Sequence, residues 1–331
     1  MVDVVALAAE LLSIDSTSGK EGQIVDHVAG WLLARGWNVT VQEVTRGRGN
    51  VWAWRAGHGV TLSTHLDTVP PYFPPRLEGS RLYGRGACDA KGIAAAMLAA
   101  AEWLAAEGEE RVDLLLLVGE EKGSDGARAA NHLPATSHYL VNGEPTESKL
   151  ATGAKGALRV LLRTSGVEAH SAYPELGRSA ITPMLELLRE IEAMQLPTDP
   201  ELGSSTVNIG VIRGGTEANV VPGWCEAELM FRVVGGCDEI EERLDRLVRG
   251  RAQVSYQSCI PAQRFHTLPG FETGTVAFTS DVPLLPRWGK PLLFGPGSIH
   301  VAHTPGEFVD VVELQQAVRT YRDIVRQLLS S

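Results

Sequence analysis

The first third of the chain changes from one spacing of apolar residues to another. In residues 2–14 and 20–35 they recur every three or four positions, which predicts two helices, and Gly36 predicts the end of the second. Residues 37–44, 50–55 and 59–66 are instead rich in Val and Trp, with alternation in the first of them, which predicts strands.

A short apolar run predicts the centre of a sheet. Residues 112–118 are apolar except for Asp113, and a run of this length is typical of a strand that is buried on both faces. An Ala-rich helix at about 91–107 precedes it, and a helix at about 124–133 and a strand at about 138–142 follow. This alternation predicts an α/β fold with an open, mostly parallel twisted sheet that is flanked by helices.

The pattern changes at about residue 153. We expect strands at 157–164, 205–212, 224–234 and 252–258 and helices at 178–194 and 238–249. The order β-α-β-β-α-β is that of a ferredoxin-like α+β domain. After about 264 the chain resumes with a strand at 290–294 and a helix at 311–329. We therefore predict one α/β domain, residues 1–152 and 264–331, that is interrupted by a smaller domain, residues 153–263.

Composition supports two domains and excludes some partners. The chain has 331 residues, 44% of them hydrophobic, which is long for a single core. Its formal net charge is −10 and it has no run of Lys or Arg, so we expect neither nucleic acid nor an anionic membrane as a partner. It shows no signal peptide and no apolar stretch of the roughly 20 residues that cross a bilayer.

The cysteines point to the compartment. The four of them are scattered and include no Cys-x-x-Cys pair, so we expect neither a disulfide framework nor a zinc knuckle. A reducing cytoplasm is then the simplest location.

Acidic residues and a histidine follow the predicted strands. His65 and Asp67 end the strand 59–66, Glu120 and Glu121 follow 112–118, and Glu144 follows 138–142. Ligands of open α/β sheets bind beyond the carboxyl ends of the strands, so these side chains should converge there. Asp89, at the start of the Ala-rich helix, should join them. Carboxylates crowded in this way need cations, which predicts a site for two metal ions.

Each residue also has an ordinary structural explanation. A lone His65 is most often a histidine of the core or surface, and Glu120 and Glu121 could be solvated charges. However, Asp67 shares a strand face with His65 and could orient its imidazole, and the glutamates directly follow an apolar strand, separated from it only by Gly119. Their shared position at one sheet edge favours the functional interpretation.

Six segments, in order, resemble a known family, the metal-dependent hydrolases that include acetylornithine deacetylase, succinyl-diaminopimelate desuccinylase, aminoacylase and glutamate carboxypeptidases. They are residues 63–70, 84–92, 119–121, 142–145, 169–174 and 295–305. The resemblance implies a zinc-peptidase-like catalytic domain with two divalent ions. Zinc is expected first, and cobalt or manganese would also suit carboxylate and imidazole ligands.

The resemblance also implies individual roles. His65 and Glu144 would bind one ion, Glu121 and His303 the other, and Asp89 would bridge both. Glu120 would be the general base and Asp67 would orient His65. Family members often have a cis peptide after the bridging aspartate, here Asp89–Ala90.

For the inserted domain, the resemblance implies a lid that forms a homodimer through residues 153–263. His170 would reach a partner's site and stabilise the oxyanion. Arg232 would bind the substrate carboxylate, with Asn208 and Asn219 lining the cleft, although an exposed strand arginine is an equally ordinary explanation of Arg232. Ser179 and Gly306 depart from the family pattern.

The expected activity is removal of an acyl group, first of all acetyl, from an N-acyl amino acid such as N-acetylornithine or N-acetyl-lysine. The basis is Glu rather than Asp at position 144, as in relatives that remove acyl groups. The alternatives are a di- or carboxypeptidase, a succinyl-diaminopimelate desuccinylase, or a protein that binds metal and amino acids without catalysis. Glu120 argues against the last, because a binding protein needs no base.

Overall fold

The structure, a computed structural model, describes residues 2–134 and 137–330, so Met1 and Ser331 at the ends of the predicted domain lie outside it. The chain divides into two compact units. Unit 1 comprises Met1–Thr152, Phe265–Gly274 and Ser280–Ser331, and unit 2 comprises Gly153–Arg264 and Thr275–Thr279. Each unit is described by itself.

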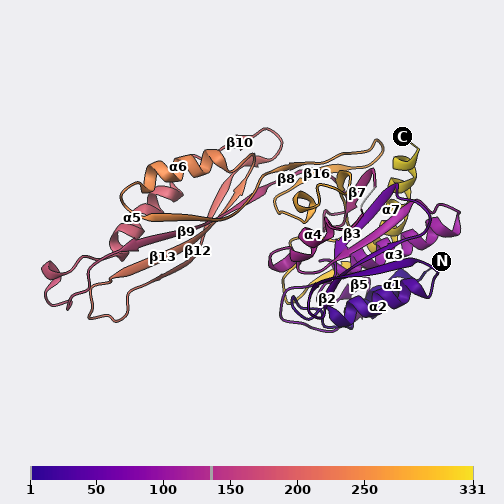
Figure 1. The fold of residues 1–331 in the computed structure, drawn as a ribbon, viewed down its shortest axis with the longest axis horizontal. Helices are drawn as coiled ribbons and strands as arrows, with labels where there is room; N and C mark the ends of the chain where they lie inside the picture. The colour runs from indigo at the N-terminus through magenta and orange to yellow at the C-terminus, as the bar shows by residue number, and fades with distance from the viewer. Residues whose placement is uncertain (1, 135–136, 331) are drawn as a thin grey trace. The chain divides into compact units, whose positions relative to one another are not determined.

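Unit 1 contains a six-stranded sheet with the order β1-β2-β6-β3-β7-β17; β2, β3 and β7 are labelled in Figure 1. The strands are β1 (Asn38–Thr45), β2 (Arg48–Trp54), β3 (Val60–His65), β6 (Val112–Leu117), β7 (Tyr139–Asn142) and β17 (Lys290–Leu293). β6, β3, β7 and β17 run parallel, whereas β2 pairs antiparallel with both β1 and β6. The predicted α/β fold with a mostly parallel sheet is confirmed.

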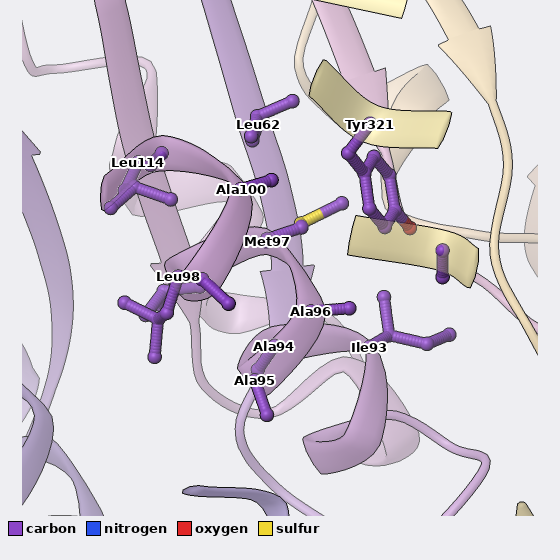
Figure 2. Packing of buried hydrophobic residues seen from close by; sticks show 14 of the residues in the cluster. Leu62, Ile93, Ala94, Ala95, Ala96, Met97, Leu98, Ala100, Leu114 and Tyr321 are labelled. Carbon is purple, nitrogen blue, oxygen red and sulfur yellow. The ribbon is translucent and has the colours of Figure 1, made fainter. Parts of the chain in front are cut away.

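Helices bury both faces of this sheet. The helices of unit 1 are α1 (Val4–Leu12), α2 (Gly22–Leu33), α3 (Lys91–Ala106), α4 (Asp125–Ala130) and α7 (Val311–Leu329). Leu114 of β6 lies in a core with side chains of α3 such as Met97, and with Tyr321 of α7 (Figure 2). The next residue along β6, Leu115, belongs to a second core with Trp52. Successive strand residues point to opposite faces, so β6 is buried on both, as its apolar run predicts.

Unit 2 contains a four-stranded antiparallel sheet with the order β12-β13-β9-β14. Its main elements are β9 (Gly156–Ser165), α5 (Ile181–Glu192), β12 (Thr206–Gly214), β13 (Trp224–Val233), α6 (Asp238–Val248) and β14 (Gln253–Ile260). This is the predicted β-α-β-β-α-β order. Alternate residues of β9 and β13, such as Leu158 and Phe231, form one core with α5 and α6, and the other face of the sheet has no helix of this unit on it.

Several short elements were not predicted. They are β4 (Arg76–Glu78), β5 (Arg81–Tyr83) and β18 (Phe308–Asp310), which form one sheet; β8 (Leu150–Ala154), β15 (Gln263–Arg264) and β16 (Thr273–Val276), which form another; and the hairpin β10 (Thr198–Asp199) with β11 (Gly203–Ser204). Strands of two to five residues carry too few side chains for a recognisable alternation, and most pair with segments distant in sequence.

Two expectations concern the environment of the chain. The expectation that the cysteines form no disulfide framework is wrong for two of them, because Cys237 and Cys259 are bonded and join the start of α6 to β14. They lie 22 residues apart and are brought together only by the packing of α6 on the sheet, so their spacing gave no signal. The cysteines therefore no longer argue for a reducing compartment. In the part of the chain that the structure describes, no helix is long and apolar enough to cross a membrane.

Candidate metal centre

The parallel strands of unit 1 end at one edge of the sheet, and the predicted metal-binding residues lie at this edge. His65 is the last residue of β3 and pairs with Leu117, the last residue of β6. Glu120 and Glu121 lie in the 3₁₀ turn η1 (Glu120–Lys122), directly after β6, and Glu144 follows the end of β7 by two residues. Asp89 lies just before α3, and the Asp89–Ala90 peptide is cis, as the resemblance implied.

A left-handed glycine allows the chain to turn sharply between β6 and η1. Gly119 has φ 75°, a conformation that favours glycine. A side chain at this position would also collide with the carboxylate of Asp125 and the guanidinium of Arg48. The turn can therefore place Glu120 and Glu121 immediately beyond the strand.

Two histidines and two carboxylates form a continuous chain of contacts. His65 Nε2 lies 3.0 Å from Asp89 Oδ1, and His303 Nε2 lies 3.3 Å from Asp89 Oδ2. His303 Nε2 is also 2.9 Å from Glu121 Oε1. Asp89 thus presents one carboxylate oxygen to each histidine, which is the arrangement that a bridging ligand requires.

Asp67 holds both His65 and the η1 turn. His65 Nδ1 lies 2.9 Å from the carbonyl oxygen of Asp67 and 3.5 Å from its Oδ1, which leaves Nε2 directed at Asp89. The Asp67 carboxylate accepts hydrogen bonds from the backbone N–H groups of Glu120, at 3.0 Å, and Glu121, at 3.2 Å. Ser18 Oγ, a contact that the sequence did not suggest, donates to it at 2.8 Å. The interaction between residues 65 and 67 is therefore made mostly through the backbone.

Two glutamates lie beside this chain of contacts, Glu144 buried and Glu120 half-buried. Glu144 is buried, and its Oε1 has no hydrogen-bond partner among the described residues. Burial, and then the negative charge of Glu120, raise the pKa of Glu144 well above its ordinary value. Burial likewise raises the pKa of Glu120, and the charges of Asp281, Glu121 and Asp89 raise it further. A raised pKa makes a carboxylate a stronger proton acceptor than an ordinary glutamate.

These residues fit divalent metal ions. Ligand atoms that share a tetrahedral zinc, with bonds of about 2.0–2.1 Å, lie about 3.3 Å apart, close to the distances around Asp89. His65, Asp89 and Glu121 each place a ligand atom within 4.8 Å of the others. Hydrogen bonds to Asp89 and Glu121 raise the pKa of His303 to about 10, so these carboxylates already hold a positive charge beside them. The unpaired Glu144 oxygen supplies a further ligand, and Zn²⁺, Co²⁺ or Mn²⁺ accepts this donor set.

Asp281 is an acidic residue near this cluster that the sequence did not reveal. It is buried, and an interaction with the side chain of Ser124 favours its charged form. Burial raises the pKa of Asp281 to about 6, while its negative charge acts on Glu120 and Glu144. It lies in a segment without recognisable periodicity, so no pattern marked it.

The predicted substrate residues all belong to unit 2. Asn208 pairs with Met230, and Arg232 with Thr206, so Asn208 and Arg232 share the sheet face opposite α5 and α6. His170 is exposed and its Nδ1 accepts a hydrogen bond from Ala172 N at 3.1 Å. Asn219 is exposed on the neighbouring strand-like segment, where its carbonyl accepts from Ser171 N at 2.9 Å. Unit 2 therefore brings these residues together as two pairs.

Comparison with known proteins now decides the family. The model of the peptidase family M20/M25/M40 matches residues 61–327. The chain belongs to this family. It is 36% identical over 370 residues to a protein of Aspergillus flavus named "probable carboxypeptidase", covering 97% of this chain and 86% of that protein.

Solved structures of this family share the fold. A tripeptidase from Staphylococcus aureus superposes with a TM-score of 0.85 at 20% identity, over 99% of this chain and 98% of that one. A dinuclear metal-binding M20 peptidase from Bacillus subtilis gives 0.77 at 15% identity, over 99% and 98%. As a family member, the chain is a metal-dependent hydrolase of amide bonds.

Proposed function

We propose that this protein is a metal-dependent carboxypeptidase that removes the last residue of short peptides. The observation that carries the proposal is the convergence of His65, Asp89, Glu121 and His303 within hydrogen-bond distance, with the half-buried Glu120 beside them. The relative with 36% identity named as a carboxypeptidase supports the substrate class. This choice replaces N-acyl amino acid deacetylation, the first expectation from the sequence, as the leading candidate.

The residues of unit 1 supply binding and proton transfer. His65 and Glu144 would hold one ion, His303 and Glu121 the other, and Asp89 both. Two divalent ions held by these residues would supply Lewis acidity toward the scissile carbonyl and an acidified water. Glu120 would be the base that accepts a proton and returns it to the leaving amine. Asp67 fixes the ring of His65 and, through two backbone hydrogen bonds, the position of Glu120.

Arg232 is the best candidate for recognition of the substrate carboxylate. Its guanidinium is half-buried, and no described residue forms an ion pair or a side-chain hydrogen bond with it. The other arginines on this sheet face are paired with glutamates: Arg159 and Arg213 with Glu228, and Arg163 with Glu226. A desolvated guanidinium without a partner is suited to a carboxylate, which it can bind through two hydrogen bonds.

Removal of an acyl group from an amino acid is the second candidate, and Glu at position 144 favours it. Both reactions cleave the amide that precedes an amino acid with a free carboxylate. They differ in what lies on the acyl side, an aminoacyl residue in a peptide and acetyl or succinyl in an N-acyl amino acid.

A substrate panel distinguishes the two candidates. Purified protein with added zinc or cobalt would be given dipeptides and tripeptides, the same peptides as C-terminal amides, N-acetylornithine, N-acetyl-lysine and succinyl-diaminopimelate. We expect release of free amino acids from peptides with a free carboxylate and no cleavage of the amides. Cleavage of the N-acyl amino acids alone would instead establish the second candidate, and cleavage of none would overturn both.

We also propose that unit 2 forms a homodimer. Five of its apolar side chains are exposed over about half of their surface or more. They are Val167, Tyr173, Leu176, Leu185 and Ile212. If His170 acts in the partner's site, a mixture of His170→Ala and Glu120→Gln proteins should regain activity through hybrid dimers. Absence of any recovery after demonstrated subunit exchange would remove His170 from this role.

A further inference from the structure

Glu307 is a buried carboxylate that holds the loop of Asp89. It is fully buried. Its Oε1 accepts three backbone hydrogen bonds, from Gly86 N at 3.0 Å, Cys88 N at 3.1 Å and Asp89 N at 3.1 Å. Three N–H groups of one short loop thus converge on a single oxygen, and one of them belongs to Asp89 itself.

The second oxygen of Glu307 binds a buried arginine. Arg85 Nη1 donates to Oε2 at 2.7 Å, and both side chains are almost completely inaccessible. Arg85 Nε donates to the carbonyl of Pro71 at 3.1 Å, and Arg85 N to that of Phe73 at 3.2 Å. The guanidinium of Arg85 therefore compensates the charge of Glu307 at Oε2, and Oε1 binds only the backbone of the Asp89 loop.

Glu307 also belongs to the segment that carries His303. Only three residues separate the two, and His303 has φ 61°, a left-handed conformation that is uncommon for a residue with a side chain. Such a conformation persists only where the surroundings hold it. Glu307 is connected to His303 along the chain and to the Asp89 loop through its carboxylate. The contact of His303 Nε2 with Asp89 Oδ2, at 3.3 Å, lies between these same two segments.

We propose that Glu307 is a positioning residue that sets the distance between Asp89 and His303 and so determines how tightly the centre retains metal. The proposal rests on the metal centre of the proposed function. Glu307 contacts no substrate and is not itself a metal ligand. It acts through the backbone of Asp89 and through the segment that leads to His303.

Asp113 provides a matched control. It is also a buried carboxylate of unit 1 with two partners, His58 Nδ1 at 2.7 Å and Trp52 Nε1 at 3.2 Å. It lies at the start of β6, however, whereas Glu120 and Glu121 follow the end of that strand. Asp113→Asn therefore reports what the loss of a buried carboxylate does without altering the loops of the centre.

The test is a calorimetric titration of chelator-treated protein with Co²⁺, with the melting temperature of each metal-free protein as a second measurement. We expect Glu307→Gln to weaken metal binding by about 10- to 100-fold, the usual effect of losing a group that orients a ligand. Whatever its melting temperature, Asp113→Asn should keep a metal affinity within about twofold of the wild type, a margin well below that effect. Wild-type affinity in Glu307→Gln, or equal weakening in Asp113→Asn, would overturn the proposal.

A second variant keeps the test decisive if Glu307→Gln does not fold. Glu307→Asp retains the charge but shortens the side chain by one methylene, and we expect it to fold and to bind Co²⁺ more weakly than the wild type. Unchanged affinity in this variant would also overturn the proposal. The titration needs no substrate, so wild-type protein that binds Co²⁺ but cleaves no peptide would defeat the proposed function and leave the role of Glu307 supported. Wild-type protein that binds no Co²⁺ would defeat both.

Discussion

The two units differ in how they hold their candidate functional residues. In unit 1 most of these residues follow the ends of buried parallel strands, and several are held by contacts with one another: His65, for example, is 1% exposed and touches both Asp67 and Asp89. In unit 2, His170, Asn208 and Asn219 are exposed, and Arg232 has no ion-pair partner among the described residues. The groups assigned to metal binding and catalysis thus contact one another within unit 1. The groups assigned to substrate binding, in unit 2, are exposed or lack an ion-pair partner among the described residues.

This difference suggests a division of labour that mutations can test. Changes in unit 1 should affect the chemical step or the electrostatics of folding, because its charges are buried. Substitution of Arg232 on the open sheet face of unit 2 should affect substrate binding, because its guanidinium has no ion-pair partner among the described residues.

The largest effect is expected for Glu120→Gln. Loss of a general base typically costs 10²- to 10⁴-fold in rate, so we expect kcat to fall about a thousandfold with metal content unchanged. The variant should also be more stable, since burial raises the pKa of Glu120 and Gln carries no charge. Steady-state kinetics, metal analysis and thermal melting measure the three quantities. A kcat near that of the wild type would exclude Glu120 as the base.

The next effect concerns the stability of unit 1 and its dependence on pH. The pKa of Asp281 is raised from 3.8 to about 6, so the folded state binds its proton more tightly than the unfolded state does. Stability from this group is therefore present below pH 4 and is lost as the pH rises to about 6. Asp281→Asn cannot ionise, so metal-free protein should gain about 3 kcal/mol above pH 6 and nothing near pH 4.

Urea unfolding at several pH values measures this gain. Glu226→Gln, which changes a solvated glutamate of an ion pair in unit 2, is the control and should alter the free energy of unfolding by less than about 1 kcal/mol. A gain in Asp281→Asn that did not vary with pH would show that the carboxylate is compensated in the folded protein.

The smallest effect is expected for Arg232→Met. Hydrogen bonds to a charged group contribute about 1.5–3 kcal/mol, so kcat/KM for peptides with a free carboxylate should fall about 10- to 100-fold, mainly through KM. Arg159→Met removes an arginine from the same sheet face that is already paired with Glu228, and its KM should stay near that of the wild type. Equal effects of the two substitutions would mean that the face acts only through its overall charge.

The sequence predicted the parts of the molecule whose signal is local. The apolar run of β6, the strand ends at His65 and Glu144 and the β-α-β-β-α-β order of unit 2 all follow from the spacing of apolar side chains. Parallel pairing then implies that the acidic residues share one edge. The position of His303 came only from the family resemblance, because its loop has no periodicity.

Other contacts depended on segments that meet only in the folded chain. The Cys237–Cys259 bond, the burial of Asp281 and the contact of Glu307 with the Asp89 loop, 218 residues away in sequence, all arise from tertiary packing. The sequence comparison with the family drew attention to Gly306, which departs from the family pattern. The carboxylate that holds the Asp89 loop in the structure belongs to the following residue, Glu307.

Metal dependence is the central claim, and titration of metal-free protein tests it most directly. Chelator-treated protein would receive Zn²⁺ or Co²⁺ in steps, while bound metal and amino acid release from a tripeptide are followed together. We predict no release without metal, and activity that rises until two ions are bound per chain. Full activity in protein shown to be free of metal, or failure to bind either ion, would contradict this account.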